Sequence, residues 1–167
     1  MGDFIEFIEG TAIAVFVRES PSIFGYTAVL SLHAMGLAIV VGIGAAMSLR
    51  LMGVAPGIPI APLLRLFPVM WIGFTINALS GLALLAANAS NMLANFMFLI
   101  KLGLIAVAVV NMELLRSRIA AAAAFGTNIV PPQTRVLAMS ALVLWLAVIV
   151  AGRLTAYPNF VSSLFWG

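Results

Sequence analysis

The chain has 167 residues, of which 64% are hydrophobic and only 8% are charged, and it contains no cysteine. A soluble domain carries about 25% charged residues because its surface faces water, so this composition excludes an ordinary soluble fold and predicts a surface that faces lipid. The absence of cysteine excludes disulfides and thiolate metal sites, and the net charge of +3 comes without the basic and aromatic clusters that are typical of nucleic-acid binding.

The N-terminal stretch, residues 3–17, places apolar residues such as Phe4 and Ile5 between acidic ones such as Glu6 and Glu9 at helical spacing. This pattern predicts a short amphipathic helix that lies on the membrane surface, with a disordered tail as the alternative. Its acidic residues are atypical of a secretory signal peptide, so we expect it to be retained. Residues 18–21 then predict a break and the N-cap of a first membrane span.

Four apolar stretches follow, and each is long enough to cross a hydrocarbon core that needs about 20 helical residues. In lipid every backbone polar group must be satisfied internally, so these stretches are expected to be helices. They cover residues 22–48, 66–87, 96–115 and 136–156.

The connections between the spans contain residues that disfavour helix continuation. Residues 53–59 predict a turn-rich loop, residues 88–91 a short polar turn, and Pro131 with Pro132 a break before the fourth span. The alanine run 120–124 predicts either an extension of the third helix or a surface helix.

The sequence therefore predicts an all-α fold, a polytopic membrane four-helix bundle with a short N-terminal amphipathic interfacial helix. We expect an interfacial segment at residues 1–21, the transmembrane bundle at 22–157 and an aromatic interfacial tail at 158–167. In that tail, Phe160, Phe165 and Trp166 are the expected membrane anchors.

The distribution of basic residues predicts the orientation, because cytoplasmic loops of membrane proteins are enriched in Lys and Arg. One side of the membrane receives Arg50, Arg65, Arg116, Arg118 and Arg135, and the other receives Arg18, Lys101 and Arg153. This bias of five to three predicts both termini on the periplasmic side of a bacterial inner membrane.

His33 is the first candidate site residue, because an ionisable group inside a membrane span is costly and marks function. Gly36 and Gly44 share its helical face and could leave room for a flat ligand. A porphyrin with His33 as the iron ligand, hence haem b, is one interpretation. A hydrogen bond between helices is the second, and proton or quinone chemistry is the third.

Lys101 and Arg153 are expected near the outer ends of the third and fourth spans. They could pair with haem propionates, with anionic lipid headgroups or with carboxylates of a partner subunit. The second axial ligand of an iron would be a distant Met, His33 of another copy, or none.

The other polar residues of the spans favour structural roles. Gly73, Asn77, Ser80 and Gly81 follow one another at helical spacing and predict a packing seam. Asn111 lies near the cytoplasmic end of the third span, where Glu113 can pair with Arg116 or Arg118. No hydrolytic triad, phosphate loop or pair of intramembrane carboxylates is present, so an enzyme is not expected.

The chain resembles an uncharacterised bacterial family of small four-helix integral membrane proteins over most of its length. The residues that carry this resemblance are Arg18-Glu19-Ser20, Tyr26, His33-Ala34-Met35-Gly36, Leu49-Arg50-Leu51-Met52-Gly53, Gly152-Arg153 and Ala156-Tyr157. The turn from His33 to Gly36 is also similar to helices of copper-resistance-type membrane proteins and b-type cytochromes. Thr27 replaces a proline of the family pattern, and Leu30 and Ser48 replace acidic residues, which removes acidic partners for His33 and Arg50.

The resemblance implies the fold but assigns no activity. We expect a membrane subunit of a homo-oligomer or of a larger assembly with other membrane proteins, which binds haem b through His33 for electron transfer. The alternatives are a purely structural subunit without a cofactor and a small transporter with a polar path through His33, Asn77 and Asn111.

Overall fold

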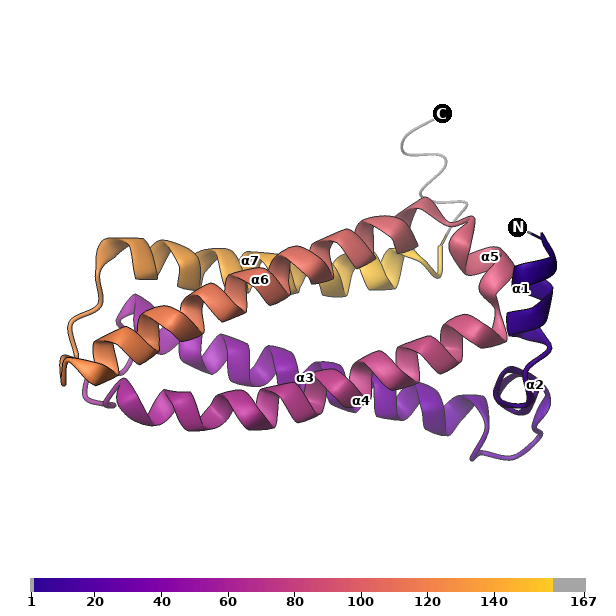
Figure 1. The fold of residues 1–167 in the computed structure, drawn as a ribbon, viewed down its shortest axis with the longest axis horizontal. Helices are drawn as coiled ribbons and strands as arrows, with labels where there is room; N and C mark the ends of the chain where they lie inside the picture. The colour runs from indigo at the N-terminus through magenta and orange to yellow at the C-terminus, as the bar shows by residue number, and fades with distance from the viewer. Residues whose placement is uncertain (1, 158–167) are drawn as a thin grey trace.

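A computed structural model describes residues 2–157, which form helices joined by short turns, without a strand in this range. Four long helices run beside one another along the length of the molecule (Figure 1). They are α3 (Tyr26–Met52), α4 (Leu66–Ala87), α6 (Phe96–Ala124) and α7 (Pro132–Leu154). The short elements are α1 (Gly2–Glu9), α2 (Ala12–Glu19), the 3-10 helix η1 (Ala61–Arg65) and α5 (Ala89–Leu93). By length and composition the four long helices, α4 taken together with η1, can each cross a membrane, so the predicted fold class is confirmed.

The observed bounds differ from the predicted spans mainly at the helix ends. Helix α4 begins and ends where the sequence predicted, and α6 continues through the alanine run to Ala124, so the extension of the third helix is the correct alternative. Helix α3 begins at Tyr26 and continues beyond Arg50 to Met52. The predicted tail, residues 158–167, lies outside the described residues.

The N-terminal segment forms two helices where a single one was expected. Thr11 separates them, since its side chain accepts a hydrogen bond from the Ala14 backbone N–H at 3.4 Å and so caps α2. Helix α2 extends through Glu19, and Gly25 is the N-cap of α3, so the N-cap predicted at residues 18–21 is wrong. Both short helices lie across one end of the bundle, near α4 and α5 (Figure 1).

The loops at the opposite end are held by side chains. Gly53 ends α3 with a φ of 106°, a left-handed conformation that glycine adopts without strain. The buried guanidinium of Arg50 donates to the carbonyl oxygens of Ile58 and Pro56, so it ties the loop to the helix. Pro132 begins α7, as the predicted break requires.

A second tie at this end joins the two halves of the chain. The Ile60 backbone N–H donates to Asn128 Oδ1 at 3.0 Å, and η1 packs against α6. The predicted polar turn at residues 88–91, at the other end of the bundle, is instead mostly helical, since Asn88 is followed directly by α5.

The bundle is packed unevenly along its length. Helix α3 packs along α4 and α7, and α6 packs along α7, whereas α4 and α6 scarcely approach each other. The core gathers at the end of the 53–60 and 125–131 loops, hereafter the packed end, and its largest side chains include Met47, Phe67, Met112 and Trp145.

Toward the opposite end, hereafter the open end, the α3–α4 pair and the α6–α7 pair diverge (Figure 1). The buried residues of the long helices beyond the core on this side are Gly36, Ser80, Ala87, Met97 and Ala151. Only Met97 among them has a large side chain, so the fully buried large side chains of the bundle lie mainly toward the packed end.

Candidate functional site

His33 lies on α3 toward the open end, and its imidazole ring is held by the neighbouring helix α4. Its Nδ1 lies 2.8 Å from the Asn77 carbonyl oxygen and 3.3 Å from Ser80 Oγ. A carbonyl oxygen can only accept, so Nδ1 carries the proton, and Nε2 keeps a free lone pair. The interhelical hydrogen bond, one of the interpretations of His33, is present. Within residues 2–157, Nε2 has no hydrogen-bond partner.

Asn77 contacts His33 a second time, through its side chain. The Asn77 amide Nδ2 donates to the His33 carbonyl oxygen at 2.7 Å, and Ser80 Oγ donates to the Ile76 carbonyl at 2.6 Å. The stripe on α4 is therefore a packing seam against α3, as predicted, but it also positions the imidazole. The sequence alone places Asn77 with His33 only on the polar path of a transporter, and it assigns Ser80 to packing alone.

A signal for this link exists in the sequence. The loop between the first two spans makes them antiparallel neighbours, so residues equally distant from the turn lie side by side. His33 and Asn77 are 44 residues apart, which places each of them 22 residues from residue 55 in that loop. This symmetry predicts their contact.

Gly36 brings the two helices into close contact. A methyl group added at Gly36 would lie 2.6 Å from the Asn77 backbone nitrogen, and one added at Gly73 would lie 2.6 Å from Ile39 Cγ2. The space that the sequence suggested for a flat ligand beside Gly36 is thus occupied by α4. The physical reason is that a missing side chain creates room only where no neighbouring helix fills it.

The other two glycines on these faces have different surroundings. A methyl group at Gly44 would lie 3.6 Å from the indole nitrogen of Trp145, so Gly44 belongs to the core and not to the surroundings of His33. One at Gly81 would lie 3.0 Å from His33 Cε1, so Gly81 makes room for the imidazole ring itself.

Lys101 lies on α6, near the open end of the other helix pair. Its alkyl chain packs against Gly152 of α7, since a methyl group there would lie 3.4 Å from Lys101 Cε. Among the described residues its ammonium makes no ion pair and no hydrogen bond. The open end therefore brings together an imidazole and an ammonium without a carboxylate between them.

Arg153 is not placed in the same way. It is exposed, and its guanidinium lies over the Tyr157 ring, 5.6 Å from the ring centroid. Of the two cations that the sequence proposed for this end, Lys101 packs along α7 and Arg153 stacks on Tyr157.

The arrangement limits which metal chemistry is available. Residues 2–157 hold no group of three or more His, Asp or Glu side chains that could bind a metal ion. His33 can supply a single nitrogen ligand. A porphyrin already provides four nitrogens to its iron, so it needs only such an axial ligand from the protein.

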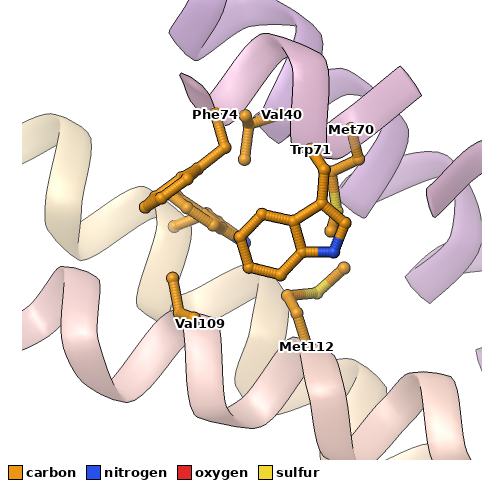
Figure 2. Close-up of a pocket in the computed structure, with 7 residues that line it drawn as sticks. Val40, Met70, Trp71, Phe74, Val109 and Met112 are labelled. Atoms are coloured by element: carbon orange, nitrogen blue, oxygen red, sulfur yellow. The ribbon is translucent and has the colours of Figure 1, made fainter. Parts of the chain in front are cut away.

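The remaining polar residues lie apart from this site. Glu113 pairs with Arg116 at 3.2 Å, as predicted, and Asn111 donates to Ser140 Oγ at 2.7 Å. Between them and His33 the bundle interior is apolar. Figure 2 shows a cavity there, of about 10 Å³, with Trp71 and Met112 among its lining side chains. This volume suits about one water molecule.

A comparison of the chain with protein-family models, with curated proteins and with solved structures finds no match. Its function is therefore inferred from the chemistry of His33 and its surroundings.

Proposed function

We propose that the protein is an integral subunit of the bacterial inner membrane that binds haem b through His33 Nε2, for electron transfer in an oligomer or a larger assembly. The observation that carries this proposal is the hydrogen bond from His33 Nδ1–H to the Asn77 carbonyl. Histidines that ligate metals commonly donate their other ring N–H to such a carbonyl, which fixes the tautomer and orients the free nitrogen. Bound haem supplies one-electron redox chemistry.

Lys101 supports the same proposal. An ammonium at this depth is costly without an anionic partner, and a haem propionate is an anion that binds there with a charge-assisted hydrogen bond. The protein offers one imidazole, so a second ligand to a bound iron would be a distant Met, His33 of another copy, or none. This assigns different roles to two residues: His33 ligates the iron, and Lys101 binds a carboxylate of the porphyrin.

The test is the absorption spectrum of the purified protein after reconstitution with haemin. We expect a Soret band that His33→Ala abolishes. Lys101→Gln retains the band but weakens haem binding, because it removes the charge and keeps the ligand. Asn77→Leu serves as the matched control, since it leaves the backbone carbonyl that holds His33 in place. A colourless wild-type preparation after reconstitution would exclude the proposal.

The second candidate is a purely structural subunit, and the close contact at Gly36 favours it. In this case the hydrogen bonds to Asn77 and Ser80 are the whole role of His33, and Gly36 serves packing within the chain. His33→Ala then lowers the stability of the bundle, while the protein binds no haem. The same spectra together with thermal unfolding distinguish the two candidates.

The proposed orientation places the open end on the periplasmic side. Four exposed arginines, Arg65, Arg116, Arg118 and Arg135, support the packed end as the cytoplasmic one. Because the chain has no cysteine, single cysteines report the orientation directly. In intact cells, an impermeant maleimide should label Ser22→Cys, and it should label Ser117→Cys only after permeabilisation. The reverse pattern would invert the orientation.

A further inference from the structure

A groove at the packed end is lined by apolar side chains and one cation, whereas the core contains apolar side chains alone. It has a volume of about 290 Å³ and lies between α4 with η1 on one side and α6 on the other. Its walls are Leu64, Phe67, Pro68, Trp71, Ala120 and a single cation, Arg116. The groove exists because α4 and α6 do not pack against each other, while η1 bridges them at the end of the bundle.

The length of α6 places this groove at the membrane boundary. With 29 residues, the helix is about 43 Å long, whereas a hydrocarbon core is about 30 Å thick. Counted from Phe96, the first 20 or so residues span the hydrocarbon core. Arg116 is therefore expected at the level of the lipid headgroups. The apolar wall formed by Phe67, Pro68 and Trp71 then lies at the level where acyl chains begin.

The charge at the groove favours an anion. Glu113 accepts one hydrogen bond from Arg116 Nη1, and a guanidinium has five N–H donors, so several remain for a ligand. Arg65 and Arg118 lie nearby in the chain, and Glu113 is the only acidic residue between positions 53 and 135. One carboxylate does not balance these guanidinium groups.

We propose that this groove binds an anionic glycerophospholipid of the adjacent leaflet. Its phosphate pairs with Arg116, and the upper part of one acyl chain lies along Leu64, Pro68 and Trp71. The apolar walls bind any phospholipid, while Arg116 selects for net negative charge. The proposal is independent of haem binding, because no residue of the groove contacts the His33 site.

Trp71 provides the readout. The protein is reconstituted in phosphatidylcholine nanodiscs that contain, as a minor component, either brominated phosphatidylglycerol or brominated phosphatidylcholine. We expect the brominated phosphatidylglycerol to quench tryptophan fluorescence more strongly at equal content. The measurements use a Trp166→Phe background, because Trp166 of the predicted interfacial tail would also report contact with lipid. In that background Trp71→Phe should remove the difference between the two lipids, since Trp145 is buried in the core.

Two arginine variants test whether Arg116 causes the preference for phosphatidylglycerol. Arg116→Gln should lower the preference for phosphatidylglycerol about fivefold, which is the effect of one basic residue near an anionic surface. Arg118→Gln is the matched control, because Arg118 is exposed on the same helix but does not line the groove. Ala120→Phe should fill part of the groove without adding a tryptophan, and it should reduce quenching by both lipids.

The proposal is overturned by equal quenching with the two lipids, which would indicate ordinary annular lipid. It is equally overturned if Arg116→Gln and Arg118→Gln have the same effect, since the preference would then come from general surface charge. All variants among the described residues alter partly or fully exposed positions, and an unchanged size-exclusion profile verifies that each is folded.

Discussion

His33 and Asn77 hold each other in both directions across the α3–α4 contact. The imidazole Nδ1–H donates to the Asn77 carbonyl at 2.8 Å, and the Asn77 amide donates to the His33 carbonyl at 2.7 Å. The backbone of Asn77 thus orients the imidazole, whereas its side chain joins the two helices. The two functions can be separated by mutation.

Asn77→Leu removes the donor to the His33 carbonyl and keeps the acceptor for the imidazole. We expect it to lower the stability of the bundle by about 1 kcal/mol, the usual scale of an interhelical hydrogen bond in a membrane. Thermal unfolding in detergent, followed by circular dichroism, measures this. Asn91→Leu is the control, because Asn91 is exposed and bonds only to Asn88. Equal effects of the two variants would contradict this role for Asn77.

Gly36 and Gly42 lie on the same helix, but substitution by alanine should have opposite effects on stability at the two positions. A methyl group at Gly36 would meet the backbone of α4 at 2.6 Å, whereas one at Gly42 meets nothing within 4 Å. We expect Gly36→Ala to destabilise the protein by about 1–3 kcal/mol through overpacking. Gly42→Ala should be neutral or stabilise it by up to about 1 kcal/mol. The unfolding midpoints of the two variants test this, and a tolerated Gly36→Ala would refute the close contact.

Arg50 should control the order of the loop that follows α3. Its buried guanidinium donates to two loop carbonyls, and hydrogen bonds to charged groups contribute about 1.5–3 kcal/mol each. Arg50→Gln is therefore expected to accelerate hydrogen exchange and proteolysis within residues 53–60. Arg65→Gln, an exposed arginine in η1, should leave both rates unchanged. Equal increases in hydrogen exchange and proteolysis in both variants would contradict this role of the Arg50 contacts. They would indicate that positive charge at this end orders the loop.

Glu9 should make the docking of α1 on α5 sensitive to pH. The Ser90 backbone N–H and the Ser90 hydroxyl, each 2.7 Å from Glu9 Oε1, hold the pKa of Glu9 below its usual range. A carboxyl whose pKa is lowered by folding stabilises the folded contact above its unfolded pKa. That stabilisation is lost as the pH falls through the lowered pKa.

An NMR titration of the Glu9 carboxyl carbon in detergent measures this shift. Its midpoint should lie below that of an unfolded peptide, and Ser90→Ala should raise it by removing the hydroxyl donor. A midpoint that Ser90→Ala leaves unchanged would assign the shift to another cause.

The long helices were predictable because each is an apolar run with polar residues at its ends. Arg65 and Asn88 bound α4, and the predicted and observed limits agree there. At α3 the same rule failed, because the span was predicted to end at residue 48, before Arg50, whereas α3 continues to Met52. Arg50 stays helical and buried since the loop carbonyls satisfy its guanidinium, and a rule based on hydropathy does not include such contacts.

The candidate site was predictable only in part. His33 was evident as the one histidine inside an apolar span, but its partners depend on which face of α4 meets α3. The role of Gly36 depends on the same contact, since its neighbour is the backbone of Gly73 and Asn77, which lie 37 and 41 residues away in the chain. The position of Lys101 depends on the divergence of the helix pairs, for which composition offers no signal.

The uneven packing of the bundle has a consequence for its internal motions. Since the large buried side chains lie near the 53–60 and 125–131 loops, we expect this end of the bundle to open last. The helix termini around His33 and Lys101 can therefore change their separation at low energetic cost while the core stays intact. A ligand that binds between the two helix pairs would then be accommodated by a change in their separation. Neither pair would need to unfold.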